Sequence, residues 1–311
     1  MQKSVFLPKD DKGEIVHAHG GHILEYEGWY YWIGEDRTGH NKVSCYKSEN
    51  LREWIFCNHI LTIESQTGEH YVTTDKRMDV EGRIAAIGYG CNIERPKVIY
   101  CEKTEKFVMW MHWELPDDYC EARCAVAVCD KIDGDYTYLG SFNPIGHMSR
   151  DCTLFKDDDG TAYFISSARE NMDLHIYRLT NDYLAIESLV KILWPGQQQE
   201  APVLFKRNGY YIMFTSGCTG WSPNQSSYAW AKSIDGIWSS RKHLGDETTF
   251  RSQSTAIVEC KEPEGRRKYW YLGDRWGGEG DKYFESQYVM LPLYFESDME
   301  LELLWLDEIS V

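Results

Sequence analysis

The sequence predicts an all-β chain folded as a five-bladed β-propeller, and three observations lead to this fold class. Aromatic, strand-like runs recur five times along the 311 residues. Each run follows a charged or glycine-containing turn, and a second apolar run precedes that turn. The helical period of apolar residues is weak throughout, so strands are expected in every part of the chain.

The two runs of each repeat are expected to pair as a hairpin across their turn. The later runs begin 78, 54, 49 and 59 residues apart, at 28–35, 106–112, 160–166, 209–215 and 268–274. The earlier runs are residues 22–26, 97–100, 152–155, 202–205 and 255–258. A repeat of roughly 40–60 residues with several short strands is typical of a propeller blade.

The remaining features of the repeat concern its extent. The long first interval predicts a large insertion around residues 60–90. No linker rich in Pro, Gly or Ser divides the chain, so residues 1–311 are expected to form one domain. A β-sandwich or a stack of hairpins is the alternative architecture, and five matching hairpins favour the propeller over it.

Composition excludes several classes of partner. The formal net charge is −16, from 49 acidic and 33 basic residues, which disfavours nucleic acid and anionic membranes as partners. No apolar run is long enough to span a membrane, and the first residues do not resemble a signal peptide. The ten cysteines include no CxxC pair, which favours reduced thiols and a cytosolic protein. Export after removal of a signal peptide is the alternative.

A polar residue or a glycine stands just before the first run of every repeat. In a propeller the innermost strands start from one face of the central channel, so residues at their heads are expected to converge on one pocket. In chain order these residues are Gly20 with Gly21, Glu94, Asp151, Glu200 and Gln253.

Three converging carboxylates predict a hydrolytic site for glycosides. Like charges that crowd together raise one another's pKa values, which leaves one protonated acid beside an ionised partner. Glycoside hydrolysis needs such a pair, one group to protonate the leaving oxygen and another to activate water or attack the anomeric carbon. A single carboxylate at a strand start more often accepts backbone N–H bonds, but three at equivalent repeat positions favour the functional interpretation.

Several motifs together resemble glycoside hydrolase family 43, and within it the branch of exo-β-1,3-galactanases. The resemblance covers nearly the whole chain. The motifs are AHGG at 18–21, YYWIGE at 30–35, ERPKV at 94–98, SRDCTLF at 149–155, EAPV at 200–203, TSGCTGWSPN at 215–224 and SQS at 252–254.

The resemblance implies a role for each matching position. Glu200 matches the general acid, and Asp151 the carboxylate that orients the acid and tunes its pKa. Most of the family has an Asp general base at the head of blade one, where this chain has Gly20 and Gly21. The galactanase branch shares that departure, and Gln253 matches the amide proposed there to position the water.

The proton acceptor stays open at this stage, because a neutral amide is a poor base. Either Gln253 acts through its imidic tautomer, or it orients water while a carboxylate such as Glu94 takes the proton.

The resemblance also implies the sugar-binding residues and the substrate. Glu35 and Glu94 match carboxylates that bind the terminal galactose, and the other expected sugar contacts are Tyr119, Asn171, Thr219, Trp221 and Asn224. The expected activity is inverting, exo-acting release of galactose from β-1,3-galactan or arabinogalactan-type polysaccharide. It calls for no metal ion, and no nucleotide-cofactor motif is found. An α-L-arabinofuranosidase or β-xylosidase of the same family, or a catalytically silent carbohydrate-binding propeller, is the alternative.

Overall fold

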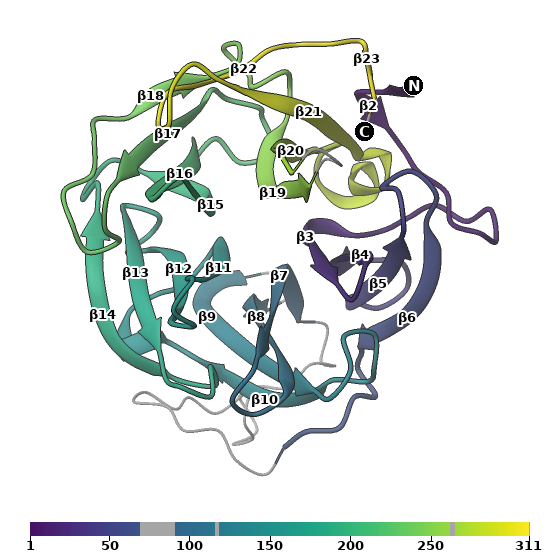
Figure 1. The fold of residues 1–311 in the computed structure, drawn as a ribbon. Helices are drawn as coiled ribbons and strands as arrows, with labels where there is room; N and C mark the ends of the chain where they lie inside the picture. Colours follow the sequence, from purple (N-terminus) through teal and green to yellow (C-terminus); the bar gives the residue numbers. More distant parts are fainter. Residues whose placement is uncertain (69–90, 116–117, 262–264, 311) are drawn as a thin grey trace.

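The computed structural model describes residues 1–68, 91–115, 118–261 and 265–310. Five antiparallel sheets stand around a central axis as the blades of a propeller, and the first strand of each blade lies nearest the axis (Figure 1). The inner strands of successive blades contact one another around the ring. The predicted five-bladed fold is therefore confirmed.

The first two blades hold four strands each. Blade one is formed by β3 (His19–Tyr26), β4 (Trp29–Asp36), β5 (Lys42–Ser48) and β6 (Ile55–Leu61). Blade two is formed by β7 (Asn92–Cys101), β8 (Lys106–Leu115), β9 (Asp118–Cys129) and β10 (Thr137–Phe142). The insertion expected around residues 60–90 falls largely on residues 69–90, which lie outside the described residues.

Blades three and four repeat this arrangement, and blade five differs. Blade three is β11 (Cys152–Lys156), β12 (Ala162–Ala168), β13 (Asp173–Leu179) and β14 (Ile186–Leu193). Blade four is β15 (Gln199–Arg207), β16 (Tyr210–Gly217), β17 (Ser226–Ala231) and β18 (Lys242–Leu244). Blade five is β19 (Gln253–Lys261), β20 (Arg267–Arg275) and β21 (Gln287–Phe295), and β22 (Leu301–Leu303) pairs with β21. Short 3-10 helices span Pro144–Gly146 (η1) and Gly280–Glu285 (η2).

The N-terminal segment closes the ring. Strand β2 (Val5–Phe6) pairs with β21 and so completes the last blade, while β1 (Gln2–Lys3) pairs with β23 (Glu308–Ile309). In Figure 1 both chain ends therefore lie beside the junction of blades five and one. In the part of the chain that the structure describes, no helix is long and apolar enough to cross a membrane.

All five expected hairpins form. Two of them turn through two residues that both have positive φ. These are Glu27 and Gly28, with φ 50° and 82°, and Asn208 and Gly209, with φ 47° and 79°. Such a turn matches the twist of the flanking strands, and Gly and Asn adopt it at least cost.

The hydrophobic core lies between neighbouring blades rather than along the axis. Five buried clusters each join residues of two adjacent blades, including the pair formed by blades five and one. Large aromatic side chains dominate them; Trp110 of blade two, for example, packs on Phe164 of blade three with ring centroids 4.8 Å apart. The channel end where the inner strands begin is thus left to polar side chains.

Candidate active site

A cavity of about 510 Å³ opens at the end of the central channel where the inner strands begin, and residues from all five blades line it. Eight of the ten site residues predicted from the sequence lie in its wall. They are Glu35, Glu94, Tyr119, Asp151, Asn171, Glu200, Trp221 and Gln253.

Bulges at the heads of the inner strands aim these side chains into the cavity. The pairing of the inner hairpin shifts register at the same place in four blades, for instance between Glu94 and Lys97 and between Glu200 and Val203. Three residues inside these bulges have left-handed backbones, Gly20 (φ 58°), Arg95 (φ 48°) and Ala201 (φ 52°). A bulge re-aims a side chain out of the regular ladder, which is why bulges recur beside active sites.

Glu200 is placed and protonated as a general acid requires. Its Oε1 accepts a hydrogen bond from Gln253 Nε2 at 3.0 Å, and its Oε2 accepts one from Asn171 Nδ2 at 3.2 Å. Burial and the nearby charge of Asp151 raise the pKa of Glu200 to about 8, although Arg95 opposes the shift. The carboxyl group therefore carries a proton at neutral pH.

Asp151 stands beside this acid and is fixed in place by two donors. Its Oδ2 lies 2.8 Å from Arg95 Nε and accepts the backbone N–H of Ala201, the residue after Glu200, at 3.0 Å. The ion pair is well shielded, since only 4% of the surface of Arg95 is exposed. This position would let Asp151 act on Glu200 through charge and orientation, the role that the resemblance implies.

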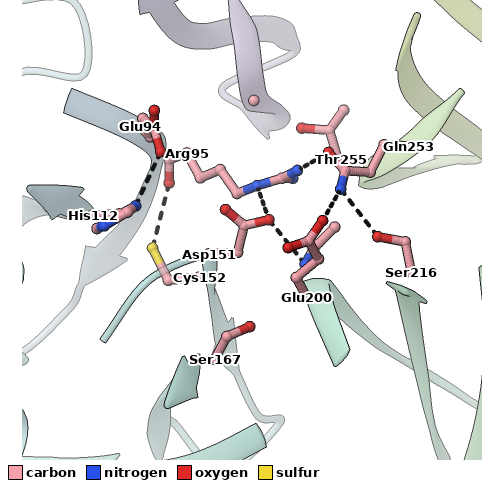
Figure 2. A network of polar contacts seen from close by, with 12 residues as sticks. Glu94, Arg95, His112, Asp151, Cys152, Ser167, Glu200, Ser216, Gln253 and Thr255 are labelled. Carbon is pink, nitrogen blue, oxygen red and sulfur yellow. Dashed lines mark hydrogen bonds and ion pairs between the residues drawn. The ribbon is translucent and has the colours of Figure 1, made fainter. Parts of the chain in front are cut away.

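Gln253 is the centre of the hydrogen-bond network shown in Figure 2. Its Nε2 donates to Glu200 and, at 3.0 Å, to Ser216 Oγ. Its Oε1 accepts from Arg95 Nη2 at 2.5 Å and from Trp276 Nε1 at 2.9 Å.

Glu94 lies on the other side of the cavity in a cationic setting. Arg37 Nη2 donates to its Oε1 at 2.9 Å, Tyr119 donates its hydroxyl to the same oxygen, and His112 Nδ1 lies 3.1 Å from Oε2. Burial alone would raise the pKa of Glu94, but His112, Arg37 and Tyr119 together hold it far below its usual range. The carboxylate stays ionised and is a very weak base.

The pKa of Glu35 shifts in the opposite direction to that of Glu94. Burial raises the pKa of Glu35 to about 7; Arg37 opposes this and Glu94 adds to it. Its Oε1 accepts the Tyr283 hydroxyl at 2.9 Å and lies 3.6 Å from Arg37 Nη2. Its Oε2 is buried and has no hydrogen-bond partner among the described residues.

One group of possible metal ligands occurs among the described residues, namely Glu94, His112 and Asp151, whose ligand atoms lie within 4.8 Å of one another. His112 Nε2 also bonds Glu114 Oε1 at 3.0 Å. Burial would lower the pKa of His112, but Glu114 and Glu94 outweigh it and raise the pKa to about 9. In this arrangement His112 pairs with Glu94 and Glu114, while Asp151 pairs with Arg95.

The head of blade one has no room for the side chain of a base. A Cβ on Gly21 would stand 1.8 Å from the carbonyl oxygen of Ile33, and one on Gly20 would stand 3.2 Å from Arg95 Cγ. The carbonyls of both glycines accept hydrogen bonds from the buried Lys97 ammonium. The absence of a carboxylate here, noted from the sequence, is thus built into the packing of the strands.

Aromatic rings form one wall of the cavity, as expected for a sugar site. Trp221, 36% exposed, meets Trp276 edge-on at 5.6 Å, and Trp276 stacks on Tyr283 at 5.9 Å. The two remaining predicted residues bond within the loop that carries Trp221. Asn224 Nδ2 donates to Thr219 Oγ1 at 2.7 Å, and Asn224 Oδ1 accepts the Gly217 N–H at 2.8 Å.

Several residues that complete the site were not singled out from the sequence. These are Arg37, Arg95, His112, Trp276 and Tyr283. Two carried a local signal, because Arg95 follows Glu94 directly and Arg37 stands two residues after Glu35. Nothing local marked the other three, whose partners in the cavity wall are Glu94, Gln253 and Glu35 on other strands.

Comparison with known proteins identifies the family of the chain. The family model described as glycosyl hydrolases family 43 matches residues 96–261. No curated protein sequence matches the chain.

Solved structures of this family superpose closely on the chain. An exo-β-1,3-galactanase from Clostridium thermocellum is 46% identical with a TM-score of 0.85, over 97% of this chain and 65% of that protein. A β-1,3-galactosidase solved with galactodeoxynojirimycin is 32% identical with a TM-score of 0.84, and the match covers both chains fully. An exo-β-1,3-galactanase from Phanerochaete chrysosporium, solved with galactose, is 30% identical with a TM-score of 0.83, over 97% of this chain and 66% of that protein. The chain thus spans slightly less than two thirds of the Clostridium enzyme.

Proposed function

Because the chain belongs to glycosyl hydrolase family 43, we propose that it is an inverting exo-β-1,3-galactosidase that releases single galactose residues from β-1,3-galactan. The observation that carries the proposal is the placement of Glu200 beside the Asp151–Arg95 ion pair, in the wall of a cavity that also has an aromatic side. A protonated carboxyl group in that position can donate to a glycosidic oxygen.

The choice of galactose rests on likeness to relatives. The three enzymes compared above act on β-1,3-linked galactose, and the Phanerochaete enzyme has also been solved with β-1,3-galactotriose. This chain shares with the galactanase branch the replacement of the blade-one base by glycine. Arabinofuranosidases and xylosidases of the family typically keep that Asp, which favours the galactanase assignment.

The shape of the site supports the exo mode. The cavity lies at one end of the channel with side chains of every blade around it, an arrangement that suits the entry of a chain end. Arg37 and Glu94 would contact the hydroxyl groups of the terminal sugar, while Glu200 would face its glycosidic oxygen.

The test is product release from β-1,3-galactobiose and β-1,3-galactan, with the anomeric proton followed by NMR as the product appears. We expect α-galactose first, and mutarotation only later. Early β-galactose would overturn inversion. Release of arabinose or xylose from their aryl glycosides, with no galactose from either galactan, would overturn the substrate. Binding without turnover would make the protein a carbohydrate-binding propeller.

A further inference from the structure

The hydrogen bonds of Gln253 fix which atom of its amide is oxygen. Arg95 and Trp276 both point N–H groups at Oε1, and neither side chain can accept a hydrogen bond. The opposite end of the amide faces a carboxyl oxygen of Glu200 and the Ser216 hydroxyl, both of which can accept. All four contacts are satisfied only by C=O toward Arg95 and NH₂ toward Glu200 (Figure 2).

This arrangement disfavours the imidic tautomer. In that tautomer the oxygen carries a hydrogen and must donate it, but two obligate donors already occupy its surroundings. The nitrogen would also have to give up one of its two hydrogens to expose a lone pair, but both hydrogens are donated in hydrogen bonds to Glu200 and Ser216. Gln253 is thus held as an ordinary carboxamide and has no free lone pair on nitrogen to act as a base.

Glu94, the other candidate from the sequence, is also a poor proton acceptor. Both of its oxygens face donors, Oε1 those of Arg37 and Tyr119 and Oε2 that of His112. A carboxylate stabilised by this many donors gains little from taking up a proton, and its pKa is correspondingly far below neutrality.

Asp151 stands on the wrong side of the reacting bond. It bonds the backbone next to Glu200 and adds to the rise in the pKa of that acid, so it lies on the leaving-group side. Inversion requires water to attack from the opposite face, with the two catalytic groups roughly 6.5–9.5 Å apart.

Glu35 meets the remaining requirements. It lies on β4 of blade one, which is not a neighbour of blade four in the ring (Figure 1), and both Glu35 and Glu200 line the cavity. Its register partner on β3 is His19, adjacent to Gly20, where the family's usual base would stand. Its Oε2 has no partner among the described residues, and burial raises the pKa of Glu35 to about 7, within the range that suits a general base.

We infer that Glu35 accepts the proton of the attacking water, and that Gln253 is a positioning residue that holds Glu200 in place as an amide. The inference rests on the proposed function. Water oxygen bonds to the anomeric carbon as the bond from that carbon to the glycosidic oxygen breaks. The electron pair stays on the leaving oxygen, which takes the proton of Glu200, while the water proton passes to Glu35. Exchange with solvent then returns a proton to Glu200 and removes one from Glu35.

Azide rescue tests the assignment, because azide attacks as an anion and needs no base. The variants Glu35→Ala, Glu35→Gln, Gln253→Ala and Glu94→Ala are assayed on 2,4-dinitrophenyl β-galactoside, whose leaving group needs no acid. Glu279→Ala joins the series because Glu279 is a further carboxylate in the cavity wall. We expect kcat of both Glu35 variants to fall at least 100-fold. Azide should restore the turnover of Glu35→Ala and form α-galactosyl azide, while the turnover of Gln253→Ala should not rise. Glu35→Gln keeps an acceptor for Tyr283, so its loss of turnover in a folded protein excludes misfolding as the cause.

A second readout addresses Gln253. Its hydrogen bond lowers the pKa of Glu200, so Gln253→Ala should move the upper limb of the pH profile of kcat/KM to higher pH. A side chain that only supported the fold would leave that limb in place. If azide restores the turnover of Gln253→Ala, Glu94→Ala or Glu279→Ala, the inference is overturned. It is also overturned if azide restores the turnover of none of the five variants.

The wild-type protein separates this inference from the proposed function. If the wild type cleaves an aryl arabinofuranoside or xyloside and no galactoside, the proposed substrate fails, and the same series on that glycoside still decides the proton acceptor. If the wild type turns over none of these glycosides, the proposed function and this inference both fail.

Discussion

Glu200 and Glu35 are both carboxyl groups withdrawn from water, and burial is the largest cause of the raised pKa of each. Their neighbours then give the two carboxyl groups different pKa values. Glu200 faces Asp151, Arg95, Cys218 and Gln253, and its pKa reaches about 8. Glu35 faces Arg37, Glu94, His19 and Tyr283, and its pKa reaches about 7. An acid that titrates above its base leaves a window of pH in which both have the form that catalysis needs.

The pH dependence of kcat/KM should therefore be bell-shaped with its maximum between about 7 and 8. Activity rises with pH through about 7 as Glu35 loses its proton, and falls through about 8 as Glu200 loses its own. The measurement is kcat/KM on β-1,3-galactobiose from pH 5 to 10. Glu35→Gln should lack the lower limb and keep the upper one, whereas an unchanged lower limb would show that another group titrates there.

Loss of the acid should depend on the leaving group. Glu200→Gln cannot protonate the glycosidic oxygen, so kcat on β-1,3-galactobiose should fall by about 1,000-fold, within the usual range for general acid catalysis. On 2,4-dinitrophenyl β-galactoside the fall should be below about 10-fold, since that leaving group departs as an anion. Glu259→Gln on the outer part of β19 is the matched control and should equal the wild type. Equal losses on both substrates would remove Glu200 from the role of acid.

At the level of elements, the bulged head of each inner strand links fold to chemistry. The heads were predictable from the sequence, because all five repeats place a polar residue or a glycine before the same apolar run. The bulges were not predictable. Of the three left-handed residues inside them, only Gly20 is of a type that signals that conformation, and Arg95 and Ala201 are not. The contacts within the site could not be predicted from the sequence either, because they join residues far apart in the chain. Tyr283 and Glu35 are 248 residues apart, and Arg95 and Gln253 are 158 apart.

The bulge of blade one depends on the absence of a side chain at Gly21. A methyl group there would meet the Ile33 carbonyl oxygen at 1.8 Å, and the nearest atoms all belong to the backbone of Ile33 and Gly34, which cannot shift as a flexible side chain can. Gly21→Ala should thus lower the free energy of unfolding by about 3 kcal/mol, the upper end of the usual cost of overpacking. Urea unfolding followed by tryptophan fluorescence measures the loss. Gly217→Ala, where the new Cβ stands an ordinary 3.4 Å from Asn224, is the control, and equal midpoints for the two variants would contradict the steric argument.

At the scale of the whole molecule, the ring holds the five strand heads at fixed distances around one cavity. Closure depends on a short N-terminal segment that hydrogen-bonds to blade five. Ser4 is fully buried at its centre; its N–H donates to the Asp307 carbonyl at 3.1 Å, and its carbonyl accepts from the Met290 N–H at 2.9 Å. An open ring would expose an edge of β21, and unpaired strand edges promote association.

Ser4→Pro tests how much this closure contributes. Proline removes the N–H and leaves the Asp307 carbonyl without its donor, which should lower the free energy of unfolding by about 2 kcal/mol. Ser4→Ala is the matched control, because it keeps both backbone bonds and removes only a hydroxyl that has no partner among the described residues. It should be neutral or slightly stabilising. We expect Ser4→Pro also to associate more readily in light scattering. Because residues of all five blades form the site, kcat of Ser4→Pro should fall at temperatures near the unfolding transition of this variant. Equal denaturation midpoints for Ser4→Pro and Ser4→Ala would mean that the ring is stable without the backbone hydrogen bond of Ser4 to Asp307.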